Sequence, residues 1–87
     1  MPLFRKNRCE LEIIERILSL AENEIKKTRL MYQTNLSYSM LVKYMNFLIE
    51  KEFLGVKTGN PSGKIYYTTN KGKKLLESIK EVHSQMQ

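Results

Sequence analysis

The chain has 87 residues, 41% of them hydrophobic, and a net charge of +6 from 15 Lys and Arg against 9 Asp and Glu. This length fits one small domain, and the hydrophobic content excludes a compositionally disordered chain. The basic balance indicates a polyanionic partner (DNA, RNA or an anionic membrane surface), with a generic basic protein as the alternative. No apolar run approaches the ~18 residues that a membrane span needs, so we expect no membrane partner.

The cysteine content and the N-terminal segment bear on the cellular compartment. Cys9 has no second cysteine to pair with, which fits a reducing cytosol. The positive charges of residues 1–8 are not followed by a long apolar run, so this segment is not a signal peptide. We therefore expect a cytoplasmic protein.

The N-terminal quarter of the chain divides into an arm and a helix. Residues 1–8 are predicted to be a basic arm, which either frays as most termini do or contacts phosphates or a minor groove. Residues 9–22 are predicted to be a helix, because two apolar rows recur at helical spacing. The first row comprises Leu11, Ile14, Leu18 and Ala21, and the second comprises Ile13, Ile17 and Leu20. So wide an apolar face favours burial by both the domain core and a partner subunit.

Two further helices separated by a tight turn follow. Thr28 is the predicted N-cap of a short helix over residues 29–34, and Asn35 begins the turn. Ser37 is the predicted N-cap of a longer amphipathic helix over residues 38–52. The residues of these two helices assigned to the core are Leu30, Met31, Tyr32, Leu41, Tyr44, Met45 and Leu48.

Two β-rich runs and a last helix complete the chain. Residues 53–58 and 64–69 flank the segment Gly59-Asn-Pro-Ser-Gly63, whose Gly and Pro residues are typical of a hairpin loop. Thr69 is the predicted N-cap of a helix from residue 70 to about residue 85. This helix carries an apolar stripe that one small domain cannot easily bury, so we expect a homodimer. The residues assigned to the dimer contact are Ile13, Ile17, Leu75, Ile79, Val82 and Met86.

This order of elements is that of a winged helix. The predicted fold class is α+β, mainly α, with a basic arm at 1–8, a winged helix-turn-helix at 9–69 and a C-terminal helix at 70–87. The motifs Lys27-Thr-Arg-Leu-Met-Tyr32 and Asn35-Leu-Ser-Tyr38 resemble the archaeal winged-helix proteins of the Sulfolobus ten-kilodalton DNA-binding type. The resemblance implies a DNA-binding homodimer, chromatin-like or a transcription regulator, that dimerises through its C-terminal helix.

The sequence departs from that family at three points. Glu52 stands where the family commonly has the Gly that ends the recognition helix. Thr68 stands where the family usually has an apolar residue before the capping Thr. The last helix is two heptads long at most, so it cannot form the long coiled-coil arm of some relatives.

Three segments make up the predicted DNA surface. Outward residues of the 38–52 helix can reach base edges in a major groove, with Lys43 donating to guanine and Asn46 pairing with adenine. The start of the preceding helix and the wing at 57–64 supply phosphate or minor-groove contacts, against the alternative of an ordinary solvated surface. The predicted contacts are Lys26, Lys27, Thr28, Arg29, Tyr38, Ser39, Val42, Lys43, Asn46, Lys57, Asn60, Ser62 and Lys64.

Catalytic motifs are missing from the sequence. His83 is the only histidine, and there is no Cys/His metal spacing, no Gly-rich phosphate loop and no Ser/His/Asp set. We therefore expect a double-stranded DNA-binding protein that is not an enzyme and uses no cofactor. The alternatives are a winged helix used for protein–protein contact and an RNA or single-strand binder. A ligand-sensing regulator is disfavoured, because the chain has no room for a sensor domain.

Overall fold

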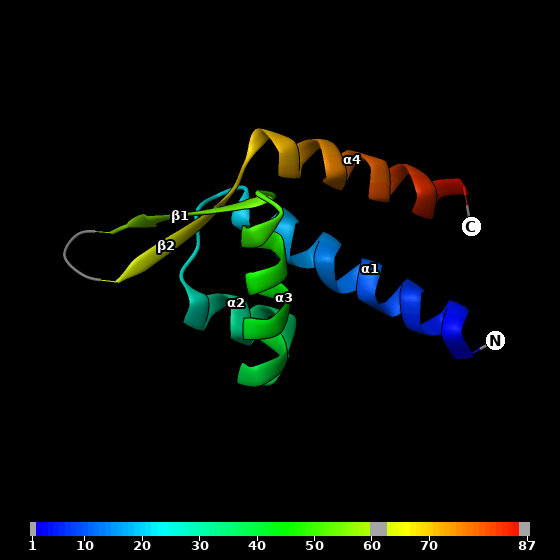
Figure 1. The fold of residues 1–87 in the computed structure, drawn as a ribbon, viewed down its shortest axis with the longest axis horizontal. Coiled ribbons are helices and arrows are strands. Elements are labelled where there is room, and N and C mark those ends of the chain that lie inside the picture. The colour runs from blue at the N-terminus through cyan, green and yellow to red at the C-terminus, as the bar shows by residue number, and fades with distance from the viewer. Residues whose placement is uncertain (1, 60–62, 86–87) are drawn as a thin grey trace.

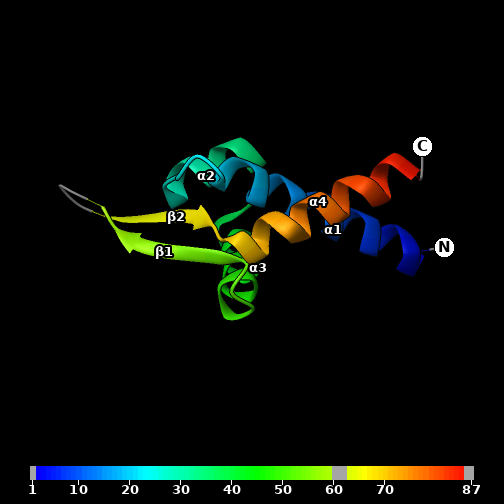
Figure 2. The same ribbon diagram turned by 90° about the horizontal axis from the view of Figure 1, so that it is seen from above.

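The computed structural model describes the backbone of residues 2–59 and 63–85 and the side chains of residues 10–59 and 63–85. The elements in chain order are α1 (Pro2–Ala21), α2 (Lys27–Thr34), α3 (Tyr38–Glu50), β1 (Leu54–Thr58), β2 (Lys64–Thr68) and α4 (Asn70–Gln85). The predicted order and the mainly helical fold class are confirmed. In Figures 1 and 2, α1 and α4 run side by side to one end of the molecule, and the β1–β2 wing points to the other.

Helix α1 starts well before the predicted boundary at residue 9. It begins at Pro2, so the backbone of residues 2–8 is helical, where the sequence analysis expected an arm. Proline fits the first position of a helix because its missing N–H would have no partner there, and residues 3–8 contain no helix breaker. The side chains of this segment lie outside the described residues, so its contact with phosphates stays a prediction.

The predicted caps have mixed outcomes. The Ser37 cap is confirmed, because its Oγ accepts a hydrogen bond from the Met40 N–H at 3.3 Å. The Thr28 cap is wrong: α2 begins at Lys27, two residues before its predicted start, after an extended Lys26 whose side chain makes no capping bond. Helix α2 ends at Thr34, and its C-cap Asn35 has a φ of 57° and donates its N–H to the Met31 carbonyl at 3.0 Å.

Helix α3 ends two residues before its predicted limit, at Glu50. Glu52 then takes a φ of 67°, the left-handed conformation that favours Gly. Its N–H donates to the Ile49 carbonyl, and the Phe53 N–H donates to the Leu48 carbonyl at 2.8 Å, so the turn satisfies the last backbone groups of the helix. A left-handed helix stop is therefore present although the family's Gly is replaced, and a glutamate occupies the strained position.

Residues from α1, α2, α3, the wing and α4 form a single core. Leu41, Met45 and Leu48 are buried, as predicted for α3. Tyr32 was assigned to the core, and this is wrong because 76% of its surface is exposed. Leu30 is fully buried, and a residue two positions further along a helix points about 200° away. Tyr44 is half-buried and packs against the core.

The wing is an antiparallel hairpin fixed to the helices at its base. Strand β1 pairs with β2 from Leu54 opposite Thr68 to Thr58 opposite Lys64. On the other edge of β2, Tyr66 exchanges two backbone hydrogen bonds with Ile25, at 2.9 and 2.8 Å. Thr68, the second departure from the family pattern, is buried and donates its hydroxyl to the Leu18 carbonyl at 2.6 Å. A threonine is therefore accommodated at this inward position by a hydrogen bond to α1.

Helix α4 starts close to the end of α3. Thr69 is confirmed as its cap, because the Thr69 Oγ1 accepts from the Gly72 N–H at 3.0 Å. The same hydroxyl donates to the Glu52 carbonyl at 2.7 Å. A side chain at Gly72 would collide with the Phe53 carbonyl, so the close approach of α4 to this turn needs glycine.

The seam between α1 and α4 buries part of the stripe that was assigned to a dimer contact. Ile17 is fully buried and Ile79 nearly so within a single chain. The argument that one small domain cannot cover the α4 stripe is therefore wrong for Ile79. Ile13 and Leu75 remain half-buried, Val82 remains exposed, and Met86 lies outside the described residues.

The burial of α3 predicts unequal costs for its two faces. Leu48→Ala should lower the free energy of unfolding by about 2–5 kcal/mol, because the truncated side chain leaves a cavity in the core. Lys43→Ala on the exposed face should change it by less than about 0.5 kcal/mol. Chemical denaturation followed by circular dichroism measures both, and similar effects from the two substitutions would contradict this assignment of faces.

The left-handed turn after α3 predicts a stabilising substitution. Glu52→Gly should raise the free energy of unfolding by about 1 kcal/mol, because glycine adopts a positive φ without steric cost. Lys43→Gly is the control, since Lys43 is exposed in the interior of α3, where glycine should lower stability by about 1 kcal/mol. Thermal melts of both variants against the parent make the comparison. A destabilised Glu52→Gly would show that the glutamate side chain does more than occupy the turn.

Candidate nucleic-acid interface

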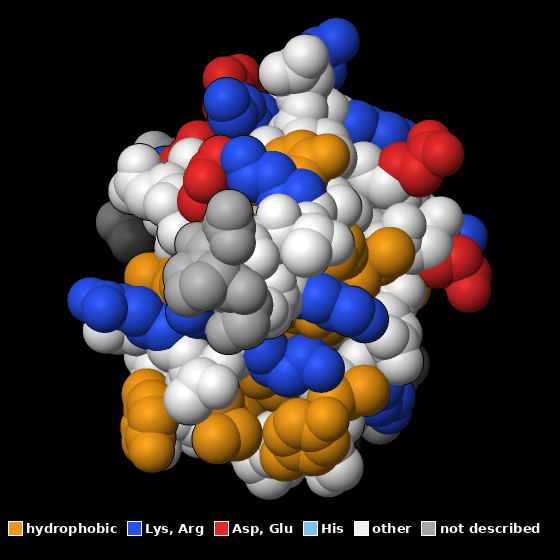
Figure 3. Space-filling model, turned by 90° about the vertical axis from the view of Figure 1, so that its left-hand side faces the viewer, with side chains coloured by type: hydrophobic (Ala, Val, Ile, Leu, Met, Phe, Trp, Pro, Cys, Tyr) orange, Lys and Arg blue, Asp and Glu red, His pale blue; other side chains and the backbone are white. Residues whose placement is uncertain are grey.

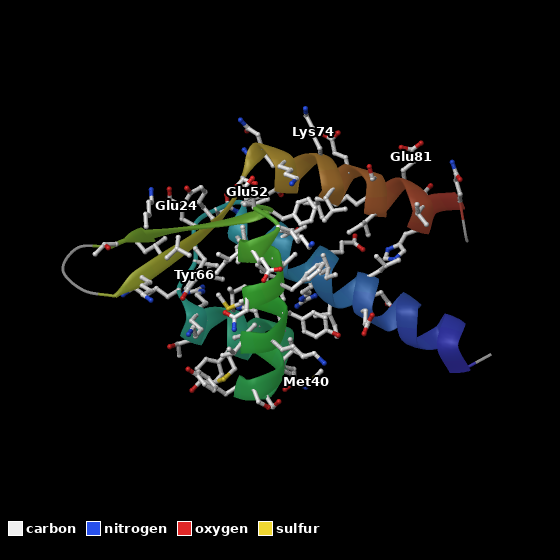
Figure 4. All side chains as sticks on the ribbon, viewed as in Figure 1. Glu24, Met40, Glu52, Tyr66, Lys74 and Glu81 are labelled. Atoms are coloured by element: carbon white, nitrogen blue, oxygen red, sulfur yellow. The ribbon has the colours of Figure 1, made fainter. Side chains whose placement is uncertain are left out.

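The outward face of α3 is polar at its centre. Ser39, Lys43 and Asn46 are exposed and lie opposite the buried Leu41 and Leu48. The N-terminal end of α3 is the end away from α4, as the position of Met40 in Figure 4 shows. This end therefore projects from the body of the molecule, and no described helix or strand lies beyond it along the axis of α3. The sequence prediction of which α3 side chains are exposed is correct for these three polar residues.

The start of α2 carries the second part of the predicted surface. Lys26, Thr28 and Arg29 are exposed, while Lys27 is half-buried with its Nζ 5.5 Å from the centre of the Tyr38 ring. This cation–π contact joins the first turn of α2 to the first turn of α3. Because Lys26 supplies no side-chain cap, the free N–H groups of the first turn add positive potential next to these cations.

An open groove lies beside the start of α2. Its lining combines the end of α1, the connecting loop and one side of α2. The lining residues are Leu20, Asn23, Glu24, Ile25, Lys26, Thr28, Arg29, Tyr32 and Gln33. It holds three of the four residues predicted to contact phosphate at this helix start. Tyr32, which the sequence analysis placed in the core, is part of this surface.

The two lysines of the wing point to opposite faces of the sheet. Lys64 lies opposite Thr58 and on the same face as Tyr66, which contacts the core. Lys57 lies on the other face, where its Nζ is 2.6 Å from the Glu24 Oε2 and 6.0 Å from the centre of the Tyr67 ring. Lys64 forms no ion pair among the residues that the structure describes.

The two wing lysines therefore differ in how free they are to bind another anion, and their contact with DNA stays a prediction. Glu24 already neutralises Lys57, and this pairing was not visible from the sequence because 33 residues separate the two. Asn60 and Ser62, the remaining predicted wing contacts, lie outside the described residues. Lys64 is thus the described wing residue best placed to act with α2 and α3.

Figure 3 looks at the molecule from the wing end. Lys and Arg side chains cross the middle of this face, hydrophobic side chains gather below them, and the carboxylates lie towards its upper part. The surface is therefore basic and apolar together. Exposed hydrophobic residues on this half of the molecule include Tyr32, Tyr38, Met40 and Val56.

The described part of the chain offers neither a metal site nor a membrane-spanning helix. Residues 10–59 and 63–85 contain no group of three or more His, Cys, Asp or Glu side chains that could hold a metal ion. None of the helices described is long and apolar enough to cross a membrane. His83 has its Nδ1 2.7 Å from the Glu15 Oε1, so it joins α4 to α1.

Comparison with known families identifies the arrangement. A family model described as winged helix-turn-helix matches residues 7–87. The chain belongs to the winged helix-turn-helix family. An uncharacterised protein of Methanocaldococcus jannaschii is 38% identical over 76 residues, which cover 86% of this winged helix and 34% of that relative. The chain thus spans about a third of the length of this curated relative.

Solved structures support the same assignment. Sso10a-2, a DNA-binding protein from Sulfolobus solfataricus, superposes with a TM-score of 0.78 at 34% identity, covering 87% of this chain and 79% of that one. F93 from STIV, a winged-helix DNA-binding protein, gives 0.73 at 25% identity, covering 85% and 86%. The resemblance to the Sulfolobus winged-helix proteins that the sequence motifs indicated is confirmed.

Proposed function

We propose that this winged helix binds double-stranded DNA, as a transcription regulator or as a chromatin-like protein. The observation that carries the proposal is the exposed polar face of α3 beside the basic start of α2, on a chain of net charge +6. Helix α3 would occupy the major groove, and the wing would reach the backbone or the minor groove. The solved relatives described as DNA-binding proteins support the same function.

The polar residues of α3 take the role of reading bases. Lys43 can donate to the O6 and N7 of guanine, and the Asn46 amide can pair with the N6 and N7 edge of adenine. Both lie on the same outward side as Ser39, a small residue that lets the helix approach the base edges. A base contact of this kind gives sequence preference, whereas a phosphate contact gives affinity alone.

The basic residues around α3 take the role of binding phosphates. Lys26, Lys27 and Arg29 are the contacts from the start of α2, and the unpaired N–H groups there favour an anion. Lys64 is the contact from the wing. Lys57 contributes less, because a phosphate would have to displace the Glu24 carboxylate that lies 2.6 Å from its Nζ.

The two faces of the wing predict different salt dependences. Lys64→Ala should weaken binding to all duplexes alike and reduce the slope of log affinity against log salt by about 1. Lys57→Ala is the matched control and should change the slope by much less. Titrations of labelled duplex at several salt concentrations measure both slopes, and equal losses from the two variants would contradict the proposed role of Glu24.

The same titrations test the function itself. Lys43→Ala or Asn46→Ala should cost about 1–3 kcal/mol on a preferred site and much less on random duplex. A parent chain that binds no duplex at low salt would contradict the proposal and favour the protein-contact alternative. A parent that prefers single-stranded DNA or RNA in competition would favour the other alternative.

We further propose that the functional unit is a homodimer, that it is not an enzyme, and that it resides on DNA in the cytoplasm. The support for a dimer is the apolar side of α1 and α4 that a single chain leaves open. Val82 is 45% exposed, Leu11 is also exposed, and Ile13 and Leu75 are only half-buried. A second copy would cover these side chains and place two recognition helices on one duplex.

The different burial of Val82 and Ile79 predicts different outcomes when each is replaced by aspartate. Val82→Asp should give a folded monomer, because its charge would be buried unpaired only at the seam between subunits. Ile79→Asp should unfold the chain, since this side chain is 4% exposed within one copy. Ser84→Asp adds the same charge at an exposed position on the side of α4 away from Val82 and should leave the dimer intact. Sedimentation and circular dichroism separate the outcomes, and a monomeric parent at high micromolar concentration would contradict the dimer.

A further inference from the structure

The first five residues of α3 are more apolar than a solvated helix end requires. Tyr38 is 60% exposed and Met40 is 39% exposed, while Val42 is half-buried. Only Leu41 in this stretch points fully into the core. Exposed large hydrophobic side chains grouped in one place, unlike single ones, mark a contact surface.

These apolar side chains flank the polar centre of the helix. Successive residues of an α-helix are about 100° apart, so Ser39 and Lys43 lie within roughly 40° of each other on the outward side. Met40 and Val42 then lie roughly 80° to either side of the line between them. A partner whose groove receives Ser39 and Lys43 would therefore also place the groups inside that groove against Met40 and Val42.

The chemistry next to this surface indicates what lies against it. Helix α3 has no acidic residue in its first turn and none before Glu50. Lys43 lies between the apolar flanks, and Lys27 is held over the Tyr38 ring. The surface is therefore complementary to an anionic partner that also presents apolar groups. The C5 methyl of thymine is the apolar group that the DNA major groove presents.

We propose that Met40 and Val42 contact thymine methyl groups in the major groove, so that this chain prefers sites rich in A·T pairs. The proposal rests on the DNA-binding function above and adds the feature of DNA that is read. The preference would arise from burial of methyl groups against two apolar side chains. The preference would therefore remain between two duplexes that present the same hydrogen-bonding groups to the polar side chains of α3.

Replacing thymine by uracil tests the proposal. A short A·T-rich duplex and the same duplex with deoxyuridine in place of thymidine offer identical hydrogen-bonding groups and differ only in the C5 methyl. The parent should bind the uracil duplex more weakly, by about fourfold for each methyl group contacted. Met40→Ala and Val42→Ala should each reduce this ratio of affinities, and the double variant should bring it close to one.

Two controls separate methyl contact from general weakening. Val56→Ala removes a side chain that is 39% exposed, as Met40 is, but that lies on the wing. The minor groove carries no thymine methyl, so this variant should keep the parent ratio. Lys64→Ala should weaken binding to both duplexes equally and also keep the ratio.

The outcomes distinguish this proposal from the function on which it rests. Equal binding of both duplexes by the parent would overturn thymine reading and leave DNA binding in place. Binding of neither duplex would overturn the proposed function. A parent ratio that survives in both alanine variants would overturn the assignment to these residues. Met40→Ala should stay folded, because alanine favours helix and Met40 is exposed. If Val42→Ala unfolds, Met40→Ala by itself tests the assignment.

Discussion

The pairing of Tyr66 with Ile25 is the constraint on which the rest of this fold depends. Ile25 lies two residues before the first residue of α2, and its two backbone hydrogen bonds to Tyr66 fix the wing to the start of that helix. The Thr68 hydroxyl adds a hydrogen bond to the Leu18 carbonyl in α1, and the Tyr66 side chain is buried in the core. The wing and the helix-turn-helix therefore cannot move independently near their junction. A duplex that contacts both meets a surface whose spacing is already set, which lowers the entropy lost on binding.

Local patterns predicted the elements well, because each depends on a few neighbouring residues. The caps at Ser37 and Thr69 followed from a hydroxyl placed before an amphipathic run, and both form. The error at α2 has the same local origin, since Thr28 is a good cap by type but Lys26 occupies the position without a capping side chain. The exposure of Tyr32 could also have been predicted from the sequence, because a residue two positions after a buried Leu30 points away from the core.

Contacts between distant residues could not be predicted in this way. The ion pair of Lys57 with Glu24 depends on the outer edge of β2, where Ile25 pairs with Tyr66. No local sequence pattern predicts that pairing. The burial of Ile17 and Ile79 likewise depends on α4 folding back along α1. An apolar stripe alone does not say whether it is covered by the same chain or by a second one. The sequence therefore identified the surface elements of the candidate site more reliably than the state of each charge on it.

The arrangement of lysines around aromatic rings limits how the net charge can act. Besides Lys27 over Tyr38 and Lys57 over Tyr67, the Lys71 Nζ lies 5.1 Å from the centre of the Phe53 ring. An ammonium group over a ring keeps N–H groups directed to solvent, so Lys27 can still bind a phosphate while its position is restricted. Lys57 differs because its ammonium group also pairs with the Glu24 carboxylate. Lys57 therefore adds little to the proposed DNA surface, and the charge of Lys27 is held in place at the junction of α2 and α3. Electrostatic attraction would then orient α3 before any base is contacted, and side chains of α3 would determine which duplex stays bound.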